Sequence, residues 1–205
     1  MEKAIAQLIM DLKAEDPHIR FAAARILGEL GKTSVDTNEA LIESLQDPVW
    51  FVRLAALQSL KELNRLNPDT ISKYIIPLLK DGHEDVREYA ALVIGSFREK
   101  AKDAVVYLAE ALQDPVWYVR ARVAQAIGQI GSEARSVCFS LLQCLADEEI
   151  AVRLSALEAL GLICVNSDNK VVDALKDVLS NEAQPLGVKK KAEIVLKKIT
   201  NKTSS

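Results

Sequence analysis

The chain has 205 residues, of which 49% are hydrophobic, 27% charged and 5% aromatic, and its formal net charge is −3. This composition excludes a wholly disordered chain. It also disfavours a dedicated nucleic-acid binder, which needs many cations to neutralise phosphates. The 8 Gly and 6 Pro are few for an all-β chain full of turns. We therefore expect helices with a core of leucine, isoleucine, valine and alanine.

A nine-residue motif recurs along the chain. Residues 45–53 read LQDPVWFVR and residues 112–120 read LQDPVWYVR, so eight of nine positions are identical. Weaker copies lie at 12–20, 79–87 and 145–153, and a degraded sixth copy is centred on Lys189. The complete copies end at Arg20, Arg53, Arg87, Arg120 and Arg153, with spacings of 33, 34, 33 and 33 residues. Such a period is typical of stacked structural repeats.

Each repeat contains two amphipathic helical patterns. After the arginine, apolar residues recur three, seven and ten positions on, as at Ala56, Leu60 and Leu63. In chain order we expect first helices at 2–13, 36–46, 68–80, 101–113, 133–146 and 169–180. We expect second helices at 17–30, 48–64, 84–99, 115–130, 148–164 and 186–200. Because one helix pair cannot bury its own apolar faces, neighbouring pairs should stack around a shared core.

The turn chemistry predicts where these helices start and stop. Pro48 and Pro115 each follow an aspartate directly, which predicts an aspartate N-cap with proline at the first helical position. Gly31 and Gly131 stand where C-caps are expected.

The motif L-x-D-P-x-x-V-R-x-x-A resembles HEAT repeats, and the short units of about 33 residues resemble the branch found in phycobilisome (phycobilin) lyases. The resemblance implies an all-α fold, a right-handed α-α superhelix (a HEAT-like solenoid) of about six antiparallel helix pairs. It also implies a structural ladder between successive turns, formed by Asp47, Arg53, Asp81, Arg87, Asp114, Arg120, Asp147 and Arg153. The first copy departs from the pattern, because Ala14 occupies the aspartate position and Asp16 is shifted by two.

We expect residues 1–205 to form a single HEAT-like domain. Its units should cover about 1–31, 32–66, 67–100, 101–131, 132–166 and 167–200, followed by a frayed tail at 201–205. The expected outward face of the second helices, the concave side of the array, carries aromatic residues and arginine in its central units. Aromatic residues and arginine are typical interface anchors, so the predicted partner-binding residues are Trp50, Phe51, Tyr89, Trp117, Tyr118 and Arg122.

The sequence offers little for catalysis or metal binding. It has two histidines, and the single pair His83-Glu84 is too little for a di-iron site; we expect His83 to be a solvated turn residue. Cys138, Cys144 and Cys164 have no CxxC spacing, so we expect buried reduced thiols in a cytoplasmic protein. No secretory signal or run of 18 apolar residues is present, so membrane insertion is not expected.

Two functions from different classes follow. The first is a non-catalytic scaffold or adaptor that binds a protein or peptide in the concave groove, without a cofactor or nucleic acid, and is a monomer when free. The second, implied by the family resemblance, is a phycobilin lyase or a chromophore-handling partner of one, which would bind a bilin. A designed or consensus-like array is a third interpretation of the near-constant unit length.

Overall fold

The computed structural model describes residues 2–30, 35–64, 66–164 and 169–200, and every regular element within these ranges is helical. The chain divides into two compact units, residues 1–93 and 94–205, with the boundary inside one helix. No helix among the described residues is long and apolar enough to cross a membrane.

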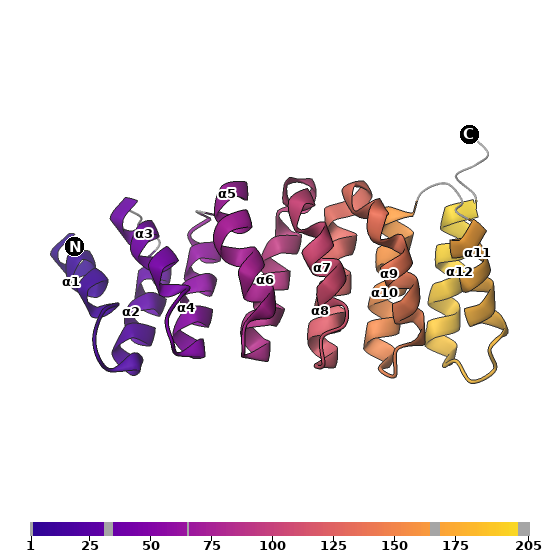
Figure 1. Ribbon diagram of the computed structural model, residues 1–205, viewed down its shortest axis with the longest axis horizontal. Helices are drawn as coiled ribbons and strands as arrows, with labels where there is room; N and C mark the ends of the chain where they lie inside the picture. The colour runs from indigo at the N-terminus through magenta and orange to yellow at the C-terminus, as the bar shows by residue number, and fades with distance from the viewer. Residues whose placement is uncertain (1, 31–34, 65, 165–168, 201–205) are drawn as a thin grey trace. The chain divides into compact units, whose positions relative to one another are not determined.

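The first unit is a stack of helix pairs. α1 (Glu2–Asp11) packs against α2 (Pro17–Glu29), and α3 (Val35–Ser44) packs against α4 (Trp50–Glu62). The second helices α2 and α4 also pack against each other (Figure 1). The next first helix is irregular: α5 (Pro68–Thr70) continues into a π turn (Ile71–Ile75) and a 3₁₀ turn (Ile76–Lys80). Pro77 explains the break, since proline has no N–H to donate inside a helix. α6 (Glu84–Ser96) follows and crosses the boundary.

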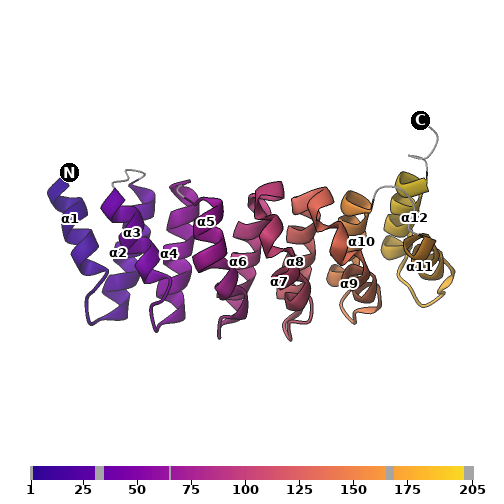
Figure 2. The same cartoon turned by 45° about the horizontal axis from the view of Figure 1, so that its top comes forward.

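The second unit repeats this plan. A 3₁₀ segment (Arg98–Ala104) leads into α7 (Val105–Ala111), which packs against α8 (Trp117–Ile130). Another 3₁₀ segment (Gly131–Val137), α9 (Cys138–Gln143) and a short 3₁₀ turn (Cys144–Ala146) pack against α10 (Ile150–Ile163). α11 (Asn169–Ser180) and α12 (Leu186–Thr200) form the last pair, seen side by side in Figures 1 and 2.

The core follows the arginine register. Ala56 and Leu60 in α4, and Val123, Ile127 and Ile130 in α8, are all buried, as the helical period predicts. Neighbouring second helices approach closely where glycine replaces a side chain. A Cβ atom at Gly128 would lie 3.0 Å from the Cα atom of Ala159, and one at Gly95 would lie 2.8 Å from the Cα atom of Ala126. A larger residue at these positions would separate the helices.

The predicted caps are only partly correct. α4 begins at Trp50 and α8 at Trp117, two residues later than expected. Asp47 and Asp114 are therefore turn residues, whose carboxylates accept the N–H groups of Val49 and Val116 at 2.8 and 2.9 Å. Gly131 does end α8, with a φ of 79° that favours glycine; Gly31 lies outside the described residues.

The expectation of three reduced cysteines is wrong. Cys138 and Cys164 form a disulfide with their Cα atoms 6.8 Å apart, and only the buried Cys144 is a free thiol. The pair comes together because α9 and the 3₁₀ segment before it pack against α10. The spacing of the cysteines in the sequence could not predict this disulfide, because the two residues are brought together by packing between helices and not by a local motif. Burial raises the pKa of the Cys144 thiol to about 11, so this thiol stays protonated at neutral pH.

Candidate functional site

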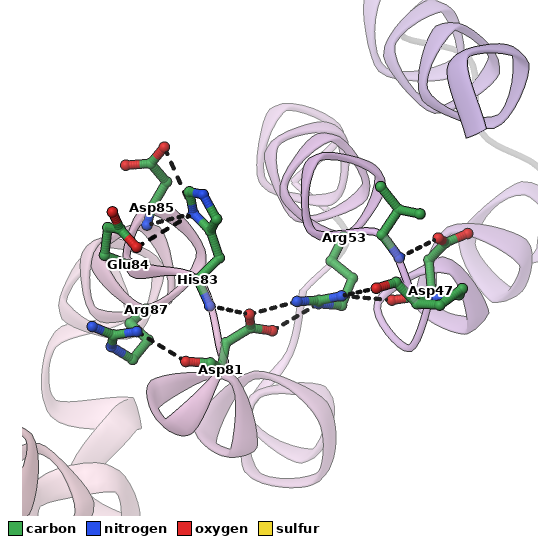
Figure 3. Close-up of polar contacts among 9 residues, drawn as sticks. Asp47, Arg53, Asp81, His83, Glu84, Asp85 and Arg87 are labelled. Carbon is green, nitrogen blue, oxygen red and sulfur yellow. Dashed lines mark hydrogen bonds and ion pairs between the residues drawn. The ribbon is translucent and has the colours of Figure 1, made fainter.

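The recurring arginines form hydrogen bonds in two directions. Nη1 of Arg120 donates to the backbone carbonyls of Asp114 and Pro115 in its own turn, at 2.8 and 3.2 Å. Nε and Nη2 donate to the carboxylate of Asp147 in the next turn, at 2.7 and 2.9 Å. Arg53 does the same with the carbonyl groups of its own turn and the carboxylate of Asp81 (Figure 3). Each rung therefore joins one repeat to the next.

This geometry corrects two details of the expected ladder. The carboxylate partner of Arg120 is Asp147, and Asp114 gives Arg120 only its carbonyl oxygen. The first repeat also has a complete rung, from Arg20 to Asp47 at 2.6 and 2.9 Å. Ala14 suffices there because the position contributes a backbone carbonyl, which accepts from Arg20 Nη1 at 2.9 Å. The arginine of a repeat therefore needs only the backbone carbonyl of the residue six positions before it, and not that residue's side chain.

The ladder ends differently at Arg153. Its Nη1 donates to the carbonyls of Asp147 and Glu148, at 2.5 and 3.1 Å, but its buried Nε has no hydrogen-bond partner. At the corresponding place in the next turn stands Asn181, 28 residues on, as Asp81 is 28 residues after Arg53. The Asn181 side-chain oxygen accepts the Ala183 N–H at 3.0 Å, just as the ladder aspartates accept the N–H two residues on. The turn is thus preserved without its negative charge.

An aromatic ridge lies at the start of the second helices in the first unit. The indole of Trp50 stacks on His83, with ring centroids 3.6 Å apart and planes 9° apart. Phe51 contacts Trp50 edge-on at 5.8 Å and stacks on His18 at 5.4 Å. His83 is therefore not a solvated turn residue: Figure 3 shows its ring beside Asp85, whose carboxylate lies 3.8 Å from Nδ1. Ridge contacts thus link three successive repeats.

The equivalent tryptophan in the second unit is more exposed than Trp50. Trp117 is 45% exposed, and its one aromatic contact that the structure describes is the edge of Tyr118 at 5.7 Å. In the first unit His83 stacks on Trp50. The repeat after Trp117 has Glu149 at the position equivalent to His83. Arg122 donates to the side chain of Gln125 at 2.9 Å. The six predicted partner-binding residues thus fall into two groups. Trp50, Phe51 and Tyr89 lie in the first unit, and Trp117, Tyr118 and Arg122 lie in the second.

A pocket opens between α2, α4 and α6 on the second-helix face of the first unit. It has a volume of about 330 Å³, and we call it the Tyr89 pocket. Its lining residues are Phe21, Arg25, Glu29, Gln58, Ser59, Glu62 and Tyr89. The sequence predicted Tyr89 as a binding residue but missed Phe21, which lies one position from the expected outward register. The four-residue spacing of Phe21 and Arg25 was the available signal, because such pairs meet on a helix.

The charges in the Tyr89 pocket are unevenly paired. Arg25 bonds to Glu29 at 2.9 Å and lies 5.8 Å from the centre of the Phe21 ring. Within the part of the chain that the structure describes, no cation lies within ion-pair distance of Glu62. Burial, together with the charges of Glu62 and Glu88, raises the pKa of Tyr89. The lining of the pocket thus combines two aromatic residues with one carboxylate that has no cation beside it among the described residues.

A second, larger cleft of about 850 Å³ lies at the turns of the second unit. Its charged lining residues include Asp114, Arg120 and Asp147, whose groups already bond to one another or to backbone atoms. Those groups stabilise the stack and have little capacity left for a ligand. The described residues contain no group of three or more metal-ligating side chains.

The chain belongs to the HEAT-repeat family. The family model for HEAT repeats matches residues 1–61 and 72–139, and the model for the single HEAT repeat matches residues 140–167. No curated protein matches the chain significantly.

Solved repeat proteins share the fold over nearly the whole chain. One is an engineered protein, with a TM-score of 0.71, 19% identity, and coverage of 96% of this chain and 98% of that one. Another is a designed armadillo repeat protein in complex with the peptide (KR)4, with a TM-score of 0.70, 18% identity, and coverage of 95% and 99%. A third is an archaeal HEAT-like repeats protein from Thermococcus onnurineus NA1, with a TM-score of 0.67, 17% identity, and coverage of 100% and 90%. At these identities the likeness establishes the α-solenoid fold alone.

Proposed function

We propose that this protein is a non-catalytic scaffold that binds a protein or peptide partner on its second-helix face. The Tyr89 pocket carries the proposal, because it is a recess on that face lined by aromatic and charged side chains from three successive second helices. Trp50 and Phe51 lie at the start of the middle one of these helices. Aromatic anchors beside a pocket are typical of the residues that dominate binding energy.

The fold supports this proposal. Repeats whose arginines hydrogen-bond to the next turn present a preorganised surface, which lowers the entropic cost of association. The designed armadillo neighbour, of similar fold, is a peptide complex. In the second unit, the exposed Trp117 with Tyr118 and Arg122 would form a second contact region.

Truncation of Tyr89 tests the proposal. The immobilised wild-type chain, Tyr89→Ala and Tyr107→Ala would each be used to capture proteins from the native source, with quantitative mass spectrometry. Tyr107 is a matched control, since it is a 44% exposed tyrosine on a first helix, α7. A partner should bind the wild-type chain and Tyr107→Ala, and bind Tyr89→Ala more weakly by about 1–2 kcal/mol.

Circular dichroism must show the same helical content for all three chains. If Tyr89→Ala captures the same proteins equally well, while charge reversal at Lys189, Lys190 and Lys191 abolishes capture, the binding site is the basic last helix and the proposal is wrong.

The remaining expectations stay predictions. The phycobilin lyase activity is tested by adding bilin and recording a red-shifted absorbance on the protein. The monomeric state is tested by light scattering, the absence of nucleic-acid binding by a gel-shift assay, and the cytoplasmic location by fractionation of the native source.

A further inference from the structure

We propose that the Tyr89 pocket binds an arginine side chain of the partner, with the guanidinium group against the carboxylate of Glu62. The inference rests on the proposed function and specifies which chemistry the second-helix face selects. It concerns only residues of α2, α4 and α6 within the first unit.

The charge balance of the pocket favours a cation. Its three charged lining residues are Arg25, Glu29 and Glu62, which sum to −1. Arg25 and Glu29 neutralise each other at 2.9 Å, so the unneutralised charge belongs to Glu62. An incoming cation would therefore meet the carboxylate of Glu62, which has no cation within ion-pair distance among the described residues.

The walls of the pocket favour a planar cation over a point charge. The rings of Phe21 and Tyr89 line it together with the Gln58 amide, whose oxygen can accept a hydrogen bond. Phe21 also makes an edge-to-face contact with Phe51, with ring centroids 5.7 Å apart. A guanidinium group stacks on aromatic rings and donates up to five hydrogen bonds in one plane. The ammonium group of a lysine could pair with the Glu62 carboxylate, but it is not planar and could not stack on the aromatic rings.

The pocket is large enough to admit one long side chain of a partner. Its volume of about 330 Å³ is at the lower end of the range for small-molecule sites. An arginine side chain would fit inside it, with room left for bridging water, while the backbone of the partner stayed on the surface. The remaining affinity would then come from neighbouring contacts such as Phe51 and the rest of the aromatic ridge.

Fluorescence anisotropy with two labelled peptides tests the proposal. One is an eight-residue peptide of alternating glycine and arginine, and the other carries citrulline, the neutral isostere, in place of each arginine. The proteins are the full chain, Glu62→Gln, and Glu133→Gln as a control. Glu133 is an exposed glutamate in the second unit, so its substitution changes the net charge equally without touching the pocket.

The full chain should bind the arginine peptide at least about tenfold more tightly than the citrulline peptide. Glu62→Gln should remove most of this preference and leave citrulline binding unchanged, while Glu133→Gln should keep the preference. Equal loss in the two variants would mean that only overall charge matters, and would overturn the proposal. Failure of the arginine peptide to bind at millimolar concentration would overturn it too.

The outcome also separates this inference from the proposed function. If both peptides bind equally and Tyr89→Ala weakens both, the second-helix face binds peptides without selecting arginine; the inference is then wrong and the proposed function stands. If neither peptide binds and partner capture is also insensitive to Tyr89→Ala, both are wrong.

Discussion

Nε and Nη2 of Arg120 donate hydrogen bonds of 2.7 and 2.9 Å to the two carboxylate oxygens of Asp147, which lies 27 residues further along the chain. Both side chains are 11% exposed. The same arginine bonds through Nη1 to carbonyl groups of its own turn. A single side chain thus fixes both the shape of one turn and the position of the next.

Replacing Arg120 with alanine should lower the free energy of unfolding by about 2–4 kcal/mol, because Asp147 is left largely buried without its cation. Arg153→Ala is the matched control, since Arg153 makes the same carbonyl contacts but has no partner for its Nε. It should cost about 1 kcal/mol. Urea denaturation measures both, and equal losses would show that the Asp147 pair contributes nothing.

The ladder should make stability depend on acid pH. The hydrogen bonds from Arg120 lower the pKa of Asp147 despite its burial. At Asp47 and Asp81 burial acts to raise the pKa, but the hydrogen bonds from Arg20 and Arg53, with those of the turns, lower it overall.

A carboxylate whose pKa is lower in the folded chain holds fewer protons there than in the unfolded chain. It therefore stabilises the fold above its unfolded pKa of about 3.9, and this contribution is lost as the pH falls through the folded pKa. Thermal melts between pH 5 and pH 2 should show this decline, with a smaller decline for Asp147→Asn than for the wild-type chain. A parallel decline in both chains would contradict the assignment.

Adding a carboxylate at the end of the ladder should stabilise the second unit. Asn181→Asp keeps the turn hydrogen bond to the Ala183 N–H. It also gives Arg153 a carboxylate in the next turn, like those that pair with Arg20, Arg53 and Arg120. A gain of about 1 kcal/mol is expected, seen as a higher midpoint of thermal unfolding. Asn181→Ala, which loses the turn acceptor, should lower the midpoint, and an unchanged midpoint for Asn181→Asp would show that Arg153 does not reach this turn.

Reducing the disulfide should destabilise the same unit. The bond between Cys138 and Cys164 closes a loop with a sequence separation of 26, for which chain entropy gives about 3 kcal/mol. Urea denaturation with and without a reductant measures the loss, and Cys138→Ala should be insensitive to the reductant. Thiol titration of the unfolded, non-reduced chain should find the Cys144 thiol alone; three thiols would contradict the pairing.

The helices were the most predictable part of this protein. The expected ranges 169–180 and 186–200 match α11 and α12 in both bounds. The burial of Ile127 and Ile130 also follows from the period. The regular spacing of about 33 residues shows which side of each helix faces the core, because the apolar positions recur at the same distances from the arginine in each repeat. Helix starts were less predictable. The pairs Asp47-Pro48 and Asp114-Pro115 form a turn before α4 and α8, whereas α2 begins at Pro17 directly after Asp16, as expected.

Contacts between repeats were harder to predict. Trp50 and Trp117 occupy the same repeat position, yet Trp50 is covered by His83 and Trp117 is 45% exposed. The difference lies in one residue of the following repeat, more than 30 positions away. The Tyr89 pocket likewise depends on the sizes of the side chains that α2, α4 and α6 contribute to its lining. Register gives the direction of a side chain, whereas a pocket depends on the volumes of all its neighbours.

The glycines between second helices set a length scale for any bound chain. At Gly95 and Gly128 the neighbouring helix comes so close that a Cβ atom would lie within 3.0 Å of its backbone, which places these helices at the short end of the usual 8–10 Å axial separation. An extended peptide advances about 3.3 Å per residue. A strand lying across such helices would thus meet an equivalent position about every second or third residue, so a recognised sequence should carry its anchors with that periodicity.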